Sequence, residues 1–159
     1  MADKHPVKSI GVIRSPFSTK EEAPIQGAFA HEAKGRLEIL PEYRDGLKDL
    51  EGFTHLHLLY LFDRAGEVKM VRSTFLSDIE HGLFATRHPC RPSGIGLTIV
   101  KMLSVDISTG IVEVGGIDVL DKTPLLDIKP YIVKFDCFPD AADGWFKGTE
   151  NRPKPKGRE

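Results

Sequence analysis

The sequence is poor in cysteine and has no long hydrophobic run, and each of these absences argues against a class of protein. The two cysteines, Cys90 and Cys137, make a poor disulfide framework and lack the CxxC spacing of a metal site, so we expect reduced thiols. No apolar run approaches the roughly 18 residues that a membrane span requires, and the N-terminus lacks the apolar core of a signal peptide. We therefore expect a cytoplasmic protein that does not associate with membranes.

The sequence also lacks an excess of charge of either sign. Its 22 Lys and Arg residues against 23 Asp and Glu residues give a net charge of -1, which excludes a globally basic coat for nucleic acid but leaves a local basic patch open. With 159 residues, 40% of them hydrophobic, the chain is long enough for one domain with a buried core. We place that domain at residues 1–138.

The hydrophobic pattern is lost after residue 138, apart from Trp145 and Phe146. We expect residues 139–159 to form a partly disordered tail, which the two aromatic residues dock onto the body or onto a second subunit. The basic residues Lys154, Lys156 and Arg158 suit either contacts with nucleic-acid phosphates or a solubilising end of the chain.

The composition changes abruptly within residues 84–102. Residues 87–96 contain too many prolines and glycines for a helix or a central strand, and they predict a loop. From Leu97 onward, β-branched residues predict a strand that anchors this loop in the core. Arg87 and Arg91 in a stiff loop suit a bound anion or a flat ring, but a proline-stiffened surface turn with solvated arginines explains the same pattern.

Other patterns predict further strands. Residues 7–13, 36–40, 53–62 and 111–114 are rich in β-branched or alternating apolar residues, and Arg14 follows the first of these runs. Residues 43–50 favour a short helix or turn, and residues 68–81 a partly helical connection. His55 and His57 would share one face of a strand, but no third ligand follows at a suitable spacing, so we expect no metal site.

Acidic residues recur in an apolar frame between residues 115 and 132. Asp118, Asp121 and Asp127 alternate there with hydrophobic residues and prolines, and such carboxylates are costly unless they are paired or hydrogen-bonded. Asp127, Lys129 and Tyr131 are spaced two apart, so an extended strand presents all three on one face. That face is either a functional surface or a cross-linked polar surface.

Several motifs, in order, resemble those of the TsaA/TrmO-like family over roughly residues 7–135. The similar stretches are Ile10-Gly-Val-Ile-Arg-Ser-Pro-Phe17, Phe53-Thr-His-Leu56, Phe84-Ala-Thr-Arg87, Arg91-Pro-Ser-Gly-Ile-Gly-Leu97 and Asp118-Val-Leu-Asp-Lys-Thr-Pro-Leu-Leu-Asp-Ile-Lys-Pro-Tyr131. The resemblance implies a mainly β fold, a single-sheet β-barrel with a few short helices and long loops. It also implies a homodimer that binds S-adenosylmethionine and methylates N6 of threonylcarbamoyladenosine at position 37 of tRNA.

The resemblance also implies the site residues. Those expected to hold S-adenosylmethionine are Pro24, Ile25, Gln26, Asp63, Arg64, Arg87, Leu97, Asp118, Val119, Leu120 and Asp121. The absence of a G-x-G-x-x-G turn agrees with a cofactor pocket made of loops. Our hypothesis is that Asp127, Lys129 and Tyr131 line the acceptor side as catalytic residues, and that Arg14 and Arg91 anchor RNA.

The chain departs from the family pattern at two places. It has Arg91-Pro-Ser-Gly-Ile-Gly96 where Arg-Pro-Asn-Pro-Ile-Gly is common, and Asp121-Lys122-Thr123 where Asp-Gly-Thr is usual. Two alternatives to the tRNA enzyme are a methyltransferase that acts on a small molecule and a non-catalytic module that binds S-adenosylmethionine. The intact Asp-Ile-Lys-Pro-Tyr run argues against the second of these.

Overall fold

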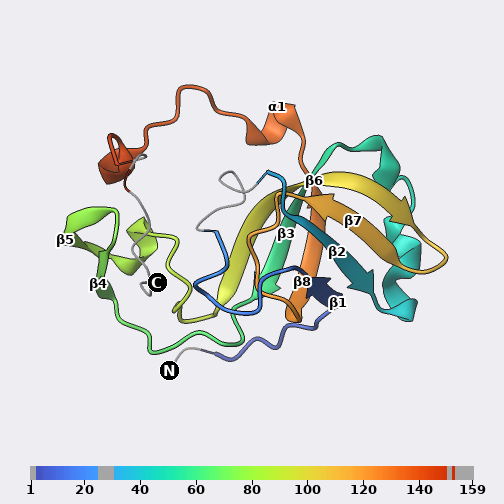
Figure 1. Cartoon of the computed structure of the whole chain (residues 1–159), viewed down its shortest axis with the longest axis horizontal. Coiled ribbons are helices and arrows are strands. Elements are labelled where there is room, and N and C mark those ends of the chain that lie inside the picture. The colour runs from blue at the N-terminus through green and yellow to red at the C-terminus, as the bar shows by residue number, and fades with distance from the viewer. Residues whose placement is uncertain (1–2, 25–30, 150–151, 153–159) are drawn as a thin grey trace.

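The centre of the molecule is a closed barrel of antiparallel strands, ordered β1-β2-β7-β6-β3-β8 (Figure 1). The computed structural model describes residues 3–24, 31–149 and 152. The barrel strands are β1 (Gly11–Arg14), β2 (Lys34–Ile39), β3 (His55–Leu61), β6 (Ile95–Asp106), β7 (Ile111–Gly115) and β8 (Thr123–Pro130). The prediction of a mainly β, single-sheet barrel is confirmed.

The remaining elements are short. Single-turn or two-turn 3₁₀ helices form at η2 (Pro41–Leu47), η3 (Leu50–Gly52), η4 (Leu83–Ala85) and η5 (Gly144–Phe146), and α1 (Val133–Asp136) follows β8. Strands β4 (Val71–Thr74) and β5 (Ser77–Gly82) pair only with each other. In the part of the chain that the structure describes, no helix has the length and apolar character that a membrane crossing demands.

Alternation of side chains along the strands fills the barrel. On β3, Leu56, Leu58 and Tyr60 are buried inside, while His57 and Leu59 between them point outward. The inward residues of the other strands complete one core, which includes Ile13, Leu37, Val100, Val112, Val114 and Leu125. The predictions at 36–40, 53–62, 97 onward and 111–114 are confirmed, and the predicted strand at 7–13 begins only at Gly11.

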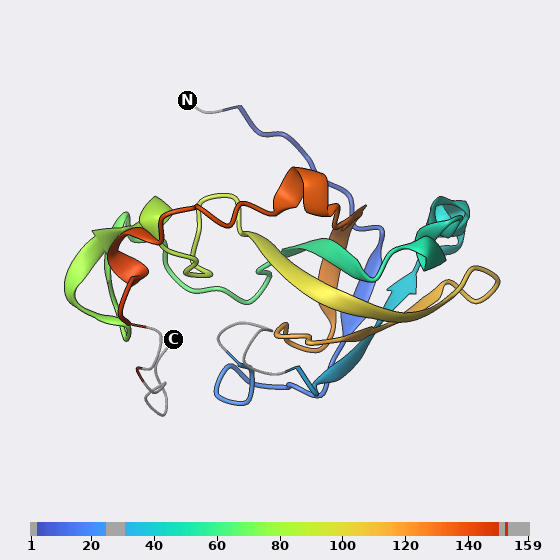
Figure 2. The ribbon, with the colours of Figure 1, turned by 90° about the horizontal axis from the view of Figure 1, so that it is seen from above.

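The partly helical connection expected at residues 68–81 is wrong. This segment forms the β4–β5 hairpin, which lies to one side of the barrel in both ribbon views (Figures 1 and 2). Its outward residues include Val71 and Ile79, exposed by 58% and 66%. Because the hairpin packs against no large core, its sequence has no clean alternation of apolar and polar residues that would have predicted strands.

Trp145 docks the segment after α1 onto this hairpin. Its indole Nε1–H donates a hydrogen bond of 2.8 Å to the carbonyl oxygen of Ala85, and its ring stacks on His81 with centroids 4.1 Å apart. Arg152 forms a bidentate ion pair with Asp78 on β5, with Nη1 3.0 Å from Oδ1 and Nη2 2.9 Å from Oδ2. The sequence left open whether Trp145 docks onto the body of the chain or onto a second subunit. In the structure it docks onto the body of the same chain. Lys154, Lys156 and Arg158 lie outside the described residues.

The two departures from the family pattern both have a backbone with positive φ. Gly94 has φ of 61°, a conformation that proline cannot adopt, so the path of this loop depends on glycine. Lys122 has φ of 65° at the turn into β8, where its N–H donates to the carbonyl oxygen of Ile13 at 2.9 Å. A side chain with a Cβ is strained in this region, since the left-handed conformation favours glycine.

Lys122→Gly is therefore expected to stabilise the protein. Relief of the left-handed strain should outweigh the greater freedom of glycine in the unfolded chain, for a net gain of roughly 0.5 kcal/mol. Thermal unfolding followed by circular dichroism measures the change. Lys101→Gly is the matched control, because Lys101 is exposed in the extended backbone of β6 and the same replacement there should destabilise the fold.

Candidate functional site

One end of the barrel gathers the loops that carry most of the predicted site residues. Strands β1, β3 and β7 end there, and β2, β6 and β8 begin there, because all neighbours in the barrel are antiparallel. The loop of residues 116–122 between β7 and β8 contains Asp118, Val119, Leu120 and Asp121. The chain after β3 adds Asp63 and Arg64, and the chain after η4 adds Arg87.

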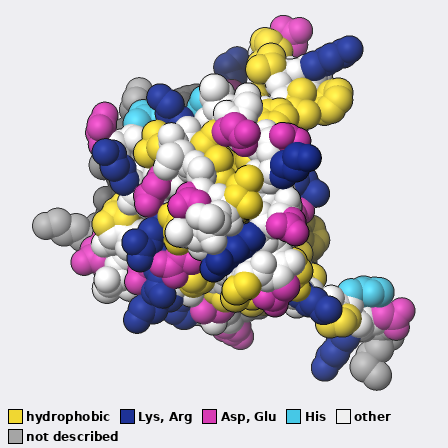
Figure 3. All heavy atoms as spheres, turned by 90° about the vertical axis from the view of Figure 1, so that its right-hand side faces the viewer, with side chains coloured by type: hydrophobic (Ala, Val, Ile, Leu, Met, Phe, Trp, Pro, Cys, Tyr) yellow, Lys and Arg dark blue, Asp and Glu magenta, His cyan; other side chains and the backbone are white. Residues whose placement is uncertain are grey.

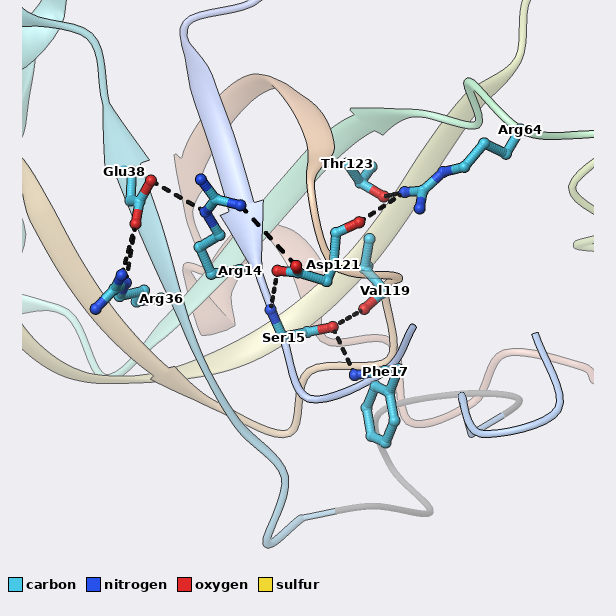
Figure 4. A network of polar contacts seen from close by, with 9 residues as sticks. All are labelled: Arg14, Ser15, Phe17, Arg36, Glu38, Arg64, Val119, Asp121 and Thr123. Atoms are coloured by element: carbon cyan, nitrogen blue, oxygen red, sulfur yellow. Dashed lines mark hydrogen bonds and ion pairs between the residues drawn. The ribbon is translucent and has the colours of Figure 1, made fainter. Parts of the chain in front are cut away.

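Ser15, directly after β1, fastens the loop of residues 116–122 (Figure 4). Its Oγ–H donates to the carbonyl oxygen of Val119 at 2.5 Å, and its N–H donates to Asp121 Oδ1 at 3.1 Å. The Asp121 N–H in turn donates to the carbonyl oxygen of Phe17 at 2.8 Å. These three bonds fix the backbone of the loop against the end of β1. Ser15 was not among the residues predicted from the sequence.

Arg14 and Arg64 approach the same loop from opposite sides in Figure 4. The Arg64 guanidinium donates to the Asp121 carbonyl oxygen at 2.9 Å and to Thr123 Oγ1 at 2.8 Å, and it pairs with Asp63 at 3.2 Å. The guanidinium of Arg14 is 3.1 Å from Glu38 and 3.9 Å from Asp121 Oδ2. The structure therefore connects Asp63 and Asp121 through Arg64, and it gives Arg14 carboxylate partners inside the chain.

Tyr60 lies at this end of the barrel, with its side chain inside. Burial raises the pKa of its phenol, the charge of Asp118 raises the pKa further and that of Arg87 lowers it, so the hydroxyl remains protonated at neutral pH. Asp118 and Arg87, which are far apart in sequence, thus act on one buried group. Tyr60 was missed as a site residue because an aromatic residue within an apolar run predicts only core packing.

The loop of residues 86–94 is shaped by Arg91. Its Nη1 donates to the carbonyl oxygens of Leu83, Thr86 and His88 at 3.4, 2.9 and 3.3 Å. The pKa of His88 falls to about 4, chiefly because the ring is desolvated and then because Arg72, Lys20 and Arg91 are positive, so His88 is neutral at pH 7. In this structure Arg91 holds the backbone of its own loop.

A second group of predicted residues lies on the outer surface of the barrel. The register aligns Leu97 of β6 with Leu59 of β3, and Leu59 with Asp127 of β8, so these residues form a row across neighbouring strands. Lys129 lies next to Asp127 along β8, with Nζ 2.8 Å from Asp127 Oδ2. That bond and the charge of Asp127 raise the pKa of Lys129, which is therefore positive at neutral pH.

Tyr131 continues this face immediately after β8. Its ring lies against the outward rings of His57 and His55, at centroid distances of 5.4 and 6.4 Å. The predicted sharing of one face by Asp127, Lys129 and Tyr131 is confirmed, and Leu97 is on the same side of the sheet. Pro24 is partly buried and precedes Ile25 and Gln26, which lie outside the described residues.

The fold and this arrangement define a class of protein: a small closed β-barrel whose candidate site is built from loops at one barrel end and from the adjoining outer face. The chain belongs to the family of the tRNA-methyltransferase O N-terminal domain, whose model matches residues 12–137. Among the described residues, no group of three or more His, Cys, Asp or Glu side chains is placed to bind a metal ion.

Known proteins of several organisms are similar to this chain. A probable S-adenosyl-L-methionine-binding protein of Pyrococcus abyssi is 40% identical over 140 residues, covering 88% of this chain and 75% of the relative. An S-adenosyl-L-methionine-binding protein of Archaeoglobus fulgidus is 40% identical, with 82% and 92% covered. The tRNA (adenine(37)-N6)-methyltransferase of Escherichia coli K12 is 36% identical, with 85% of this chain and 61% of the enzyme covered.

Solved structures agree with this fold. A crystal structure of TrmO superimposes with a TM-score of 0.78 at 40% identity, covering 89% of this chain and 64% of that chain. TrmO from Pseudomonas aeruginosa gives a TM-score of 0.75 at 39% identity, with 90% and 63% covered. This chain therefore spans less than two thirds of the length of either solved TrmO chain.

Proposed function

We propose that this protein is an S-adenosylmethionine-dependent methyltransferase that acts on N6 of threonylcarbamoyladenosine at position 37 of tRNA. The observation that supports the proposal best is the row from Leu97 through Leu59 to Asp127. It puts an expected cofactor residue on the same outer surface as Asp127, Lys129 and Tyr131, which we call the acceptor face. Membership of the family and the similarity to the Escherichia coli enzyme support it.

The residues at the barrel end suit S-adenosylmethionine chemically. Asp118 and Asp121 offer carboxylates for a ribose diol or the cationic parts of the ligand, and Leu120 offers apolar surface for the adenine ring. Leu97, on the adjoining outer face, offers further apolar surface, whereas Val119 is buried in the core and supports the loop from below. Bonds from Ser15 and Arg64 hold the loop of residues 116–122, so this part of the proposed site keeps its backbone conformation without the ligand. Pro24, Ile25, Gln26, Asp63, Arg64 and Arg87 complete the proposed set. The bound cofactor supplies an electrophilic methyl group.

The acceptor face aligns the nucleophile. Transfer of a methyl group is an in-line displacement that depends chiefly on alignment. We assign Asp127 to accept a hydrogen bond from the N6–H, and Lys129 to attract the carboxylate of the threonyl group or a phosphate. Tyr131 borders this face through its ring. Arg14 and Arg91 are proposed to meet RNA through the solvent-facing parts of guanidinium groups that also bind within the chain.

A homodimer fits the outer surface of β6. Ile95, Leu97 and Ile99 are exposed by 41%, 50% and 45%, and alternation puts all of them on one face of the strand. This stripe includes Leu97, the first residue of the row that runs to Asp127. A second copy bound to the stripe would therefore also border the proposed methyl-transfer site. The face shown in Figure 3, in contrast, mixes positive, negative and apolar side chains without a broad area of one kind.

Ile99→Glu is expected to yield monomers. A charge buried in the subunit interface is strongly unfavourable, so the mass measured by light scattering should fall from twice 17.7 kDa to 17.7 kDa. Ile107→Glu is the control, since Ile107 is an exposed residue of the turn between β6 and β7. A monomeric wild-type protein would contradict the dimer.

The decisive experiment is a methyl-transfer assay with labelled S-adenosylmethionine. Purified protein is incubated with tRNA that carries threonylcarbamoyladenosine and with matched tRNA that lacks it, and the nucleosides are then separated. Label only on the modified adenosine is the expected result. Cofactor binding without transfer to either tRNA would overturn the proposed activity and favour a small-molecule acceptor, with which the net charge of -1 is also compatible.

A further inference from the structure

A partly buried polar contact connects β3 to the short helix that follows β8. His57 points outward from β3, yet its side chain is only 18% exposed because Tyr131 and the start of the α1 region cover it. Its Nε2 lies 3.3 Å from Asp136 Oδ2, and the Asp136 side chain is 29% exposed. His57 and Asp136 are distant in sequence, so their contact is a product of the fold.

Asp136 also accepts a hydrogen bond from the backbone next to Tyr131. The N–H of Ile132, the residue after Tyr131, donates to Asp136 Oδ2 at 2.8 Å, and this bond lowers the pKa of Asp136. The N–H of Tyr131 donates to the His55 carbonyl oxygen at 3.0 Å. The main chain at residues 131–132 is therefore connected to β3 in two ways. The Tyr131 N–H bonds directly to His55, and the Ile132 N–H bonds to Asp136, which in turn contacts His57.

The Tyr131 ring packs against the rings of His57 and His55 on β3. Its centroid is 5.4 Å from that of His57 with 37° between the planes, while His55 meets it edge-on at 6.4 Å. His55 is held in turn by Thr54, whose Oγ1 lies 2.9 Å from His55 Nδ1. Without His57, Tyr131 would lose the ring beneath it, and Asp136 would lose its partner on β3.

We propose that His57 and Asp136 are positioning residues that hold the Tyr131 ring in place beside Asp127 and Lys129 for methyl transfer. The pair touches none of the reacting atoms and acts through Tyr131. Register places His57 directly opposite Lys129 on β8, so the ring that supports Tyr131 lies on the same face of the sheet as Lys129. This proposal rests on the proposed function, since it assigns a role within the same site.

Steady-state kinetics of four variants test the role in the reaction. His57→Ala removes the ring and the donor, and we expect kcat to fall about 10-fold or more with KM for S-adenosylmethionine changed less than about 2-fold, because misalignment affects turnover more than cofactor binding. His57→Gln keeps an N–H donor at similar reach and should recover much of the activity. Asp136→Ala, which removes the oxygen that contacts both His57 and the Ile132 N–H, should resemble His57→Ala, and the matched control His31→Ala, at an exposed position, should resemble wild type.

Fluorine NMR tests the positioning independently of turnover. The chain has 3 tyrosines, so 3-fluorotyrosine labelling gives few resonances, and Tyr131→Phe identifies the resonance of Tyr131. We expect His57→Ala to shift this resonance towards that of free fluorotyrosine and to narrow it, and His57→Gln to do so far less.

The outcomes separate this inference from the proposed function. If wild-type protein methylates tRNA and His57→Ala has the same kcat, the positioning role is wrong. The role is also wrong if the Tyr131 resonance is unchanged in His57→Ala, or if the loss of activity only follows a lower melting temperature. An inactive wild-type protein whose Tyr131 resonance still responds to His57→Ala would overturn the proposed methyl transfer alone.

Discussion

Asp127→Asn is expected to slow methyl transfer to modified tRNA by about 100-fold or more, the range typical of a lost catalytic hydrogen bond or proton acceptor. Asp127 Oδ2 is 2.8 Å from Lys129 Nζ, and Oδ1 accepts the N–H of Ile128 at 2.9 Å, so the carboxylate is fixed on the acceptor face. The amide cannot offer two acceptor oxygens, and it lacks the charge that keeps Lys129 in position. Single-turnover transfer of labelled methyl groups measures the effect.

The matched control is Asp140→Asn, an exposed aspartate in the segment after α1, which should leave transfer unchanged. Binding of S-adenosylmethionine to Asp127→Asn, measured by calorimetry, should remain within about 2-fold of wild type, because our proposal assigns Asp127 to the acceptor and not to the cofactor. Lys129→Ala should lower turnover as well. Wild-type turnover in Asp127→Asn would remove Asp127 from the mechanism.

Gly96→Ala is expected to lower the free energy of unfolding by roughly 2–3 kcal/mol, the cost of overpacking a core, and the melting temperature by roughly 4–12 °C. A Cβ at Gly96 would lie 2.8 Å from Cδ2 of Tyr60 and would overlap other atoms of the same ring. Tyr60 is 6% exposed, and it is braced by Phe62 at a centroid distance of 5.2 Å. The ring therefore cannot move aside without disturbing the core.

A double-mutant cycle identifies the cause of this loss. In the background of Tyr60→Leu, Gly96→Ala should cost clearly less than it does in wild type, because the ring that it overlaps is gone. Gly46→Ala is the control, since nothing lies within 4 Å of a Cβ built there. Equal costs of Gly96→Ala in both backgrounds would show that the ring is not responsible.

The barrel strands were predictable from the sequence, and the hairpin was not. Leu56, Leu58 and Tyr60 alternate with outward residues because β3 has a buried side and an exposed side, and this alternation is visible in the sequence. Residues 71–82 lack such a division, because the β4–β5 hairpin is outside the barrel core.

The candidate site was predictable in part. The spacing of Asp127, Lys129 and Tyr131 follows from strand geometry alone. The hydrogen bonds of Arg91 to carbonyl groups of its own loop could not be predicted, because every residue has a main-chain oxygen and the sequence does not indicate which of them an arginine will meet. The contact between His57 and Asp136 was equally hidden, because it depends on how the chain turns after β8.

Closure of the barrel also restricts how this protein can associate through its main chain. Each of the six barrel strands has a hydrogen-bonded neighbour on both sides, so within the described residues none of them is an edge strand. Among the strands that the structure describes, open edges remain only on the two strands of the β4–β5 sheet. Strand addition by another chain, including the pairing that starts ordered aggregates, would have to begin at that hairpin, whereas partners of the barrel must bind through side chains.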